Sequence, residues 1–254
     1  MSNQLVLTAL PDIPLVKQDD DIARLISNGL QNAKIELQDN DVIVIASKII
    51  SKAEGRLVRL RDVTPGARAL ELAQATGKDA REIELMLQES SDVVRTRKDL
   101  IVTRHRLGFV SANAGIDHSN VQEGADDFVL LLPLDPDATA QDLCTRLYQE
   151  TGKQVAVIIA DSHGRPHRMG TIGIAIGCAG LPALEDWRGR ADLFGYELKH
   201  TDIGLADMLA SAATLLFGQA REATPLVHVR GATWYGEPNN ARTLVRPKEM
   251  DLFP

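Results

Sequence analysis

The chain has 254 residues, a mass of 27.7 kDa and a formal net charge of −7. Hydrophobic residues make up 44% and charged residues 25%, which is typical of a globular protein that can bury a sizeable core. The acidic balance and the pI near 5.4 argue against a nucleic-acid partner, because phosphate contacts along a nucleic acid need a basic face. A phosphorylated small molecule is not excluded, since a few local Lys and Arg side chains can bind one.

In chain order, apolar β-branched runs predict buried strands, and apolar residues at helical spacing predict amphipathic helices. These patterns give a strand over 5–10, a helix over 19–30, a strand over 42–46, two helices within 65–89, an extended run over 100–110, a strand over 128–132, a helix over 139–149, strands over 155–160 and 171–179, a helix over 202–217 and a strand over 226–230. Helical segments are interspersed with apparent hairpins, so we expect an α+β fold with mixed, largely antiparallel sheets and packed helices.

Polar residues and glycines mark the expected ends of several helices. Asp79 is expected to cap the second helix of the 65–89 pair, and Gly152 and Gly218 to end two later helices. The run Thr139-Ala-Gln-Asp142 resembles a capping box and is predicted to open the helix over 139–149. The small, basic segment 47–56 is expected to be a surface loop rather than another core element.

Neither a signal peptide nor a membrane helix is expected. The N-terminus lacks a basic region followed by an apolar segment, and no apolar stretch reaches the roughly 20 residues of a membrane span. Cys144 and Cys178 lack the spacing of a zinc site or a disulfide framework and are expected to be small core residues. We therefore expect a cytoplasmic protein without a membrane partner.

Two oxygen-rich segments follow predicted strands. Asn113-Ala-Gly-Ile-Asp-His-Ser-Asn120 comes after the extended run, and Asp161-Ser-His-Gly-Arg165 is expected to form a turn after the strand over 155–160. Two carboxylates with hydroxyl and amide neighbours suit Mg²⁺ or Mn²⁺, which prefer oxygen ligands. The same residues are also the commonest turn formers, so a turn is the better explanation of either segment alone. Because both segments follow probable buried strands, the two explanations have about equal weight for the pair.

Several basic residues lie near these segments. Lys48 and Lys52 follow a buried strand, where α/β proteins bind ligands, although an ordinary solvated loop explains them as well. Arg165, His167 and Arg168 are able to hold anionic groups or to pair with the excess acids. The sequence has neither a phosphate-binding P-loop nor a dinucleotide-binding glycine motif, and the glycine-rich run 170–180 is predicted to be a strand with close backbone packing. No serine or cysteine is placed as a hydrolase nucleophile.

Several motifs occur in order along the chain. They are Ser47-Lys-x-x-Ser-Lys-Ala-Glu-Gly-Arg56, Asn113-Ala-Gly-Ile-Asp-x-Ser-Asn120, Leu131-Leu-Pro-Leu-Asp-Pro-Asp137, Asp161-Ser-x-Gly-Arg-Pro166, Ala175-Ile-Gly-x-Ala-Gly180, Asp186-x-x-Gly-x-x-Asp192 and Val229-Arg-Gly231. Together these motifs resemble those of the coenzyme F420:L-glutamate ligase family. They span nearly the whole chain, and their common order is far more specific than any one of them.

The resemblance implies a GTP-dependent amide ligase that adds L-glutamate to a coenzyme F420 precursor through an acyl phosphate, with successive γ-linked additions and release of GDP and phosphate. It also implies an intertwined homodimer with an unusual, family-specific α+β fold, and a requirement for Mg²⁺ or Mn²⁺ with K⁺ as an additional ion. A single ligase domain over residues 1–254 is expected, without the C-terminal nitroreductase-like domain of some relatives.

The resemblance also implies a set of site residues and no covalent catalytic residue. The metal ligands would be Asp117, Asp161, Ser162 and Gln219. The GTP contacts would be Ile13, Pro14, Leu15, Val16, Ser47, Lys48, Lys52, Asn120, Phe217, Gly218, Gln219, Ala220, Arg221, Glu222, Ala223 and Thr224.

Two other functions fit parts of the sequence. The two Asp segments alone would equally suit a metal-dependent phosphohydrolase that acts on a phosphorylated small molecule. A regulatory module would bind GTP without turning it over. Formation of GDP that depends on glutamate separates both from the ligase.

Overall fold

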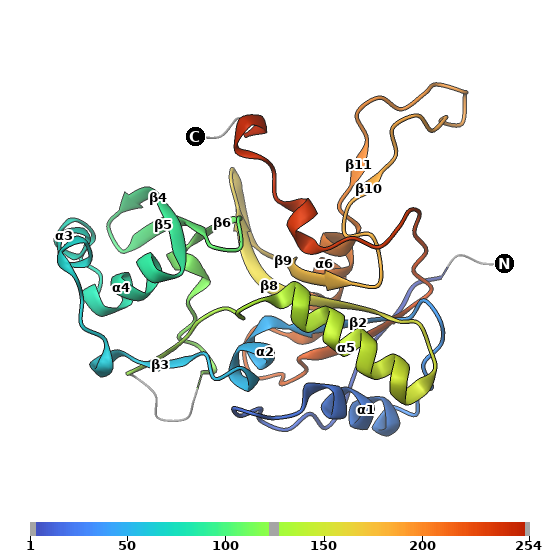
Figure 1. Cartoon of the computed structure of the whole chain (residues 1–254), viewed down its shortest axis with the longest axis horizontal. Helices are drawn as coiled ribbons and strands as arrows, with labels where there is room; N and C mark the ends of the chain where they lie inside the picture. Colours follow the sequence, from blue (N-terminus) through green and yellow to red (C-terminus); the bar gives the residue numbers. More distant parts are fainter. Residues whose placement is uncertain (1–3, 122–126, 252–254) are drawn as a thin grey trace.

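The computed structural model describes residues 4–121 and 127–251, and its centre is a five-stranded sheet (Figure 1). The strands are β1 (Val6–Ala9), β2 (Val42–Ala46), β8 (Ala156–Arg165), β9 (Arg168–Ala179) and β12 (Leu226–Arg230), in the order β1-β12-β2-β8-β9. The β2–β8 pair is parallel, and the other three pairs are antiparallel. The predicted α+β class with mixed, largely antiparallel sheets is confirmed.

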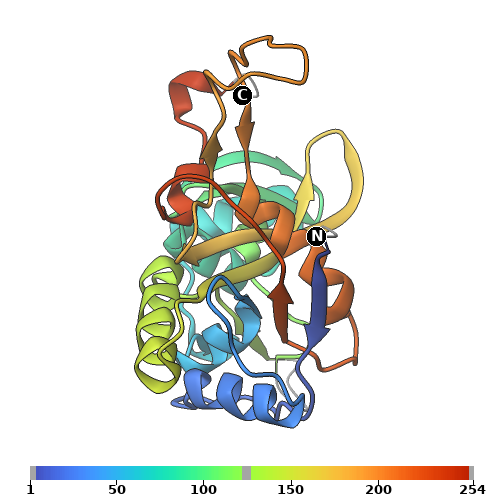
Figure 2. The ribbon, with the colours of Figure 1, turned by 90° about the vertical axis from the view of Figure 1, so that its right-hand side faces the viewer.

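Helices cover both faces of this sheet. Helices α1 (Ile22–Asn32) and α5 (Pro136–Thr151) pack on one face, and α6 (Leu205–Phe217) packs on the other (Figure 2). Successive side chains of a strand point to opposite faces, so Ile43 contacts the α1 and α5 side while Val44 contacts the α6 side. Burial on both faces explains the unbroken apolar run of β2.

Strand β9 lies at the edge of the sheet and is closely approached by two helices. A Cβ added at Gly177 would lie 2.5 Å from the backbone of Pro136, and one at Gly173 would lie 2.5 Å from the carbonyl oxygen of Ala210. The prediction that this glycine run forms a closely packed strand is confirmed. The carboxylates of Asp207 and Asp137 accept hydrogen bonds from the edge N–H groups of Ala175 (2.8 Å) and Cys178 (2.9 Å).

A smaller lobe, on the left in Figure 1, contains helices α3 and α4 and a three-stranded sheet. Its elements are α3 (Ala67–Thr76), α4 (Ala80–Gln88), β4 (Ser90–Arg97), β5 (Leu100–His105) and β6 (Val110–Ala112). Ile83, Met86 and Ile101 form its separate buried core. Asp79 caps α4 through a hydrogen bond from the N–H of Arg81 (2.8 Å), as predicted.

Shorter elements connect the lobe to the main sheet and extend from it. They are α2 (Ser47–Ala53), the pair β3 (Leu57–Arg59) and β7 (Phe128–Leu130), the pair β10 (Glu185–Asp186) and β11 (Asp202–Ile203), and 3-10 turns at Leu60–Asp62, Asn113–Gly115, Ala241–Leu244 and Lys248–Met250. Strands β10 and β11 form the base of a long projecting loop (Figure 1).

An ion-pair cluster joins the smaller lobe to the centre. Glu89, which follows α4, contacts Arg56 at 2.7 Å, Arg106 at 3.0 Å and His105 at 3.6 Å. The Nε–H of Arg56 also donates to the carbonyl oxygen of Leu132 at 2.9 Å. Burial raises the pKa of Glu89, but the contacts with His105 and with the two arginines outweigh burial and hold it at about 2.

Three local predictions are wrong. Segment 47–53 is helix α2 rather than a loop, because its apolar pair, Ile49 and Ile50, is buried against the sheet. Residues 161–165 continue β8 rather than turning, since pairing with β9 extends the strand to Arg165. Helix α5 begins at Pro136 with Asp135 as its cap, so the capping box predicted at residues 139–142 lies inside the helix.

Other expectations hold, and several short or polar strands were missed. Gly152 and Gly218 follow the last residues of α5 and α6, and both cysteines are buried and free. Strand β4 was not predicted, because its sequence is mostly polar. Over the described ranges 4–121 and 127–251, none of the helices is long and apolar enough to cross a membrane.

Candidate functional site

The predicted site residues line one cavity of about 570 Å³. Strands β2 and β8 run parallel with Ala46 opposite Ala160, so the residues that follow, Ser47 and Asp161, are neighbours at one place in the sheet. The lining includes every residue predicted as a metal ligand or GTP contact: Ile13, Pro14, Leu15, Val16, Ser47, Lys48, Lys52, Asp117, Asn120, Asp161, Ser162, Phe217, Gly218, Gln219, Ala220, Arg221, Glu222, Ala223 and Thr224. The structure brings these residues together, and their binding of a metal ion and of GTP remains a prediction.

Asp161 and Ser47 form the floor of the cavity. The hydroxyl of Ser47, buried at the start of α2, donates to Asp161 Oδ1 at 2.9 Å. Burial raises the pKa of Asp161 to about 6 against the effect of this hydrogen bond, and the negative charge of Asp117 adds to the rise. Two carboxylates therefore lie close enough in the cavity to repel one another.

Two lysines of α2 connect the floor to the loop that carries Asp117. Lys48 Nζ lies 3.2 Å from Asp117 Oδ2 and donates to the carbonyl oxygen of Ser119 at 2.7 Å. Lys52 Nζ donates to the carbonyl oxygen of Asn120 at 2.8 Å. Burial and the neighbouring charge of Lys48 lower the pKa of Lys52. Both ammonium groups thus face the cavity, where a phosphate would offer a stronger partner than a carbonyl oxygen.

The loop around Asp117 is held in shape by backbone pairing and by tight turns. Asp117 exchanges two backbone hydrogen bonds with Leu130, at 3.0 and 2.9 Å. Asn113, Ala114 and Gly115 before it have positive φ values of 51°, 53° and 66°. A Cβ at Gly115 would also lie 2.7 Å from Leu132 Cδ1. Glycine is therefore needed there because of its positive φ and because a side chain would not fit.

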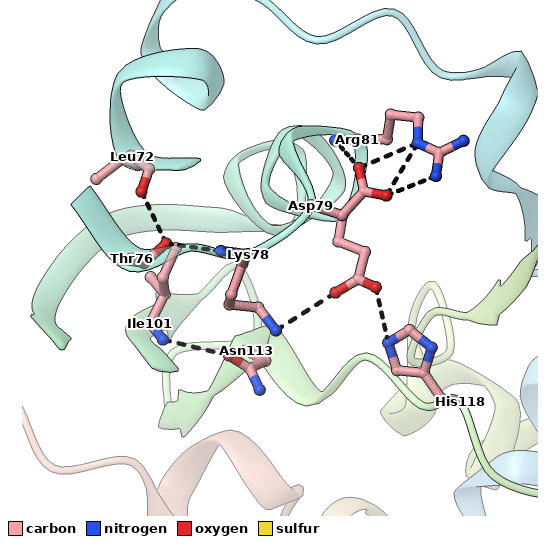
Figure 3. Close-up of polar contacts among 9 residues, drawn as sticks. Leu72, Thr76, Lys78, Asp79, Arg81, Ile101, Asn113 and His118 are labelled. Atoms are coloured by element: carbon pink, nitrogen blue, oxygen red, sulfur yellow. Dashed lines mark hydrogen bonds and ion pairs between the residues drawn. The ribbon is translucent and has the colours of Figure 1, made fainter. Parts of the chain in front are cut away.

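The smaller lobe braces the same loop, as Figure 3 shows. The side-chain oxygen of Asn113 accepts a hydrogen bond from the N–H of Ile101 at 3.2 Å. Glu82 of α4 lies 3.3 Å from His118 and 3.4 Å from Lys78. The asparagine at the head of the motif is therefore structural, and α4 is tied to the residue next to Asp117.

The segment after α6 forms another part of the cavity wall. Gly218 ends the helix with a φ of 72°, and the hydroxyl of Thr224 turns back to the carbonyl oxygen of Leu216 at 2.6 Å. The side-chain amide of Asn120 donates to the carbonyl oxygen of Ala220 at 2.6 Å, and Ser162 Oγ lies 3.3 Å from Gln219 Oε1. These contacts join the segment after α6 to Asn120 and to β8.

The side chains fit a hard divalent cation. The donors proposed from the sequence, Asp117, Asp161, Ser162 and Gln219, all offer oxygen, and a cation between the two carboxylates would relieve their repulsion. In the described parts of the chain, no three His, Cys, Asp or Glu side chains gather as a metal-binding group. Two carboxylates with neutral oxygens match Mg²⁺, which keeps water and phosphate oxygens as its remaining ligands.

Some residues considered from the sequence lie elsewhere, and others were missed. Arg165, His167 and Arg168 belong to the β8–β9 hairpin and do not line this cavity, and His163 packs its ring on Phe109. The missed lining residues are Ala46, Ile49, Ala112, Gly115, Ile116, Ser119, Ala160, Thr214 and Pro225. Ser119 lies inside a recognised motif, whereas the helical pattern around Thr214 gives no sign that it faces a cavity.

The fold and the cavity define an α+β protein with a ligand site of lysines and oxygen donors. The sequence matches the family described as F420-0:Gamma-glutamyl ligase over residues 12–231, and the chain belongs to this family. The match confirms the resemblance inferred from the motifs.

Proteins named coenzyme F420:L-glutamate ligase are similar to the chain over nearly its full length. The one from Methanothermobacter thermautotrophicus is 44% identical over 249 residues, which cover 97% of this chain and 98% of that protein. The one from Methanopyrus kandleri is 45% identical over 242 residues, covering 94% and 93%. The one from Archaeoglobus fulgidus is 43% identical over 241 residues, covering 95% and 93%.

Proposed function

We propose that the protein is a GTP-dependent ligase that joins L-glutamate to a coenzyme F420 precursor. Family membership and the name shared by the relatives support ligation of glutamate to coenzyme F420. The observation that carries the nucleotide part is the cavity of about 570 Å³, in which two lysine ammonium groups lie with two carboxylates and neutral oxygens. Such a set binds a phosphate chain together with a divalent cation.

Each part of the cavity has a role in this proposal. Lys48 and Lys52 would bind phosphate oxygens, and the segments 13–16 and 217–224 would enclose the nucleoside. Asp117, Asp161, Ser162 and Gln219 would hold Mg²⁺ or Mn²⁺, and K⁺ is proposed as an additional ion. When bound, the divalent cation neutralises charge on the phosphate oxygens.

The proposed reaction has two steps and needs no protein nucleophile. The carboxylate of the coenzyme precursor attacks the γ-phosphorus of GTP, the bond to the bridging oxygen breaks, and GDP leaves. The amine of L-glutamate then attacks the acyl carbon, phosphate leaves, and the nitrogen loses a proton to form the amide. The protein contributes position and charge, which carry most of phosphoryl transfer. Repetition would give successive γ-linked additions. A homodimer and a cytoplasmic location remain part of the proposal.

Mass spectrometry of the coenzyme tests this function. Incubated with the precursor, L-glutamate, GTP and Mn²⁺, the protein should yield a coenzyme heavier by one or more glutamyl units, with one GDP per unit added. Omission of Mn²⁺ or of glutamate should stop both products. If GTP is hydrolysed whether or not glutamate is present and the coenzyme mass does not change, the ligase proposal is wrong and the phosphohydrolase is favoured.

A further inference from the structure

A second cavity, of about 300 Å³, lies along the outer edge of β9. Its walls come from β5 and the loop after it, β9, the first turns of α5 and α6, and the 3-10 turn Ala241–Leu244 with the residues after it. Its lining includes Arg104, Phe109, Asp137, Asp207, Arg242 and Arg246. A volume near 300 Å³ is at the small end of ligand sites, which suits a molecule of amino-acid size.

Two arginines of this cavity are weakly engaged. Arg104 of β5 lies 3.4 Å from the carbonyl oxygen of Gly108 and 3.8 Å from Asp251, and its side chain is only 26% exposed. Arg246 has no hydrogen-bond or ion-pair partner within residues 4–121 and 127–251. Guanidinium groups bind carboxylates by paired, charge-assisted hydrogen bonds, and long contacts leave those donors available.

The acidic side chains of the cavity differ in what they bind. Asp137 Oδ1 accepts from the N–H groups of Cys178 and Ala241, each at 2.9 Å, and Asp135 caps α5. Asp207 accepts one hydrogen bond, from Ala175 to Oδ1, and among the described residues its Oδ2 has no donor. A half-buried carboxylate oxygen without a donor favours an approaching ammonium group.

The two cavities share no lining residue, but paired residues of β8 and β9 link their walls. Ala160 and Asp161 line the first cavity, and their direct partners across the β8–β9 pair, Ala175 and Ile174, line the second. His163 lies two residues beyond Asp161 on the same strand, and its Nε2 is 2.8 Å from the carbonyl oxygen of Val110, which also lines the second cavity. Asp207 accepts a hydrogen bond from the N–H of Ala175 at 2.8 Å, and Ala175 is paired with Ala160, the residue before Asp161. An ammonium group at Asp207 would therefore lie beside the strand that carries Asp161.

We infer that the second cavity binds the amino-acid substrate, L-glutamate, with Arg104 and Arg246 receiving its two carboxylates and Asp207 its ammonium group. Glutamate carries two negative groups and one positive group, which is the reverse of the charges that these three side chains offer. The inference rests on the proposed function, because that function supplies glutamate as the substrate.

Steady-state kinetics of charge-removing variants test the site. Arg104→Gln, Arg246→Gln and Asp207→Asn should each raise the apparent KM for L-glutamate roughly 10- to 100-fold, as expected for loss of one charge-assisted contact. The apparent KM values for GTP and for the coenzyme precursor should not change. Asp207→Asn keeps the acceptor for Ala175, and Arg246 is exposed, so both variants are expected to fold. Arg68→Gln, an exposed change on α3, is the matched control and should behave as the wild type.

Direct binding makes the result independent of turnover. Equilibrium dialysis of radiolabelled L-glutamate, with a non-hydrolysable GTP analogue and Mg²⁺ present, should show binding by the wild type and Arg68→Gln and its loss in the three variants. An unchanged glutamate KM in the variants, or no binding by the wild type, overturns the inference. If the wild type forms product but the three variants keep the wild-type KM for glutamate, only the placement of glutamate in the second cavity is rejected. Glutamate binding without any glutamylated coenzyme would reject only the proposed function.

Discussion

Asp161 is a carboxylate held where ionisation is unfavourable. Its pKa of about 6 lies above the ordinary carboxyl value of 3.8, so ionisation destabilises the metal-free fold as the pH rises from about 4 to about 6. A bound cation would reverse this, because opposite charge favours the carboxylate form. The residue is therefore better explained by a positively charged ligand than by a role in stability.

The variant Asp161→Asn should distinguish a role in binding a cation from a role in stabilising the fold. The amide keeps an acceptor for Ser47 but loses the charge, so turnover should fall at least about 100-fold. Without metal, the variant should melt at a higher temperature than the wild type at pH 7 and at a similar temperature at pH 4. Calorimetric melting and product formation measure these effects. Near wild-type turnover would show that the carboxylate is incidental to the reaction.

Lys52→Ala should weaken GTP use in particular. Removal of one charge-assisted phosphate contact is expected to raise the apparent KM for GTP roughly 10- to 100-fold and to leave that for glutamate unchanged. Lys153→Ala, at an exposed position after α5, is the matched control. An increase confined to the KM for glutamate would mean that Lys52 lies beside the other substrate.

The sequence reveals some of these residues better than others. Asp117 and Asp161 stand in oxygen-rich runs that suggest a cation, and Lys52 follows a buried strand. The apolar wall from Ile13 to Val16 has no chemical pattern of its own and was placed only through family resemblance. Distance along the chain also hides the site, since Asn120 and Ala220 meet through a contact that no local pattern predicts.

At the scale of elements, long-range pairing decided where the predictions failed. Residues 161–165 are turn formers by type, yet their pairing with β9 keeps them extended, because strand preference depends strongly on context. Helix α2 was missed because it is short, and its lysines face the cavity while Ile50 faces the core. The long, strongly periodic α6 and the buried strands were predictable, since burial on both faces leaves a continuous apolar run.

The packing of β9 against α5 gives a stability prediction. Gly177→Ala places a methyl group 2.5 Å from the backbone of Pro136, so α5 must shift, at a cost of about 1–3 kcal/mol. Gly164→Ala on β8 is the control, because nothing lies within 4 Å of its Cβ and its φ is not positive. Urea unfolding of both variants measures the difference. Equal stability would show that α5 adjusts freely.

At the scale of the whole molecule, the Glu89 cluster joins the smaller lobe to the main sheet. Glu89→Gln leaves Arg56 and Arg106 without their carboxylate partner and should lower the free energy of unfolding by about 2–3 kcal/mol at pH 7. Because the pKa of Glu89 is lowered to about 2 from 4.5, its contribution is complete above pH 4.5 and is lost as the pH falls towards 2. Urea unfolding at several pH values measures this, and a difference that persists unchanged at pH 2 would contradict it.

The free edge of the main sheet is also protected. A strand at the edge of a sheet can recruit a strand from another molecule, because its outward N–H and C=O groups are unpaired. On β9 the N–H groups of Ala175 and Cys178 are already occupied by the carboxylates of Asp207 and Asp137. A foreign strand would have to displace both acids and leave negative charge beside its own backbone. Continuous sheets through this part of β9 are therefore disfavoured, and the fold resists fibre-like aggregation at this edge.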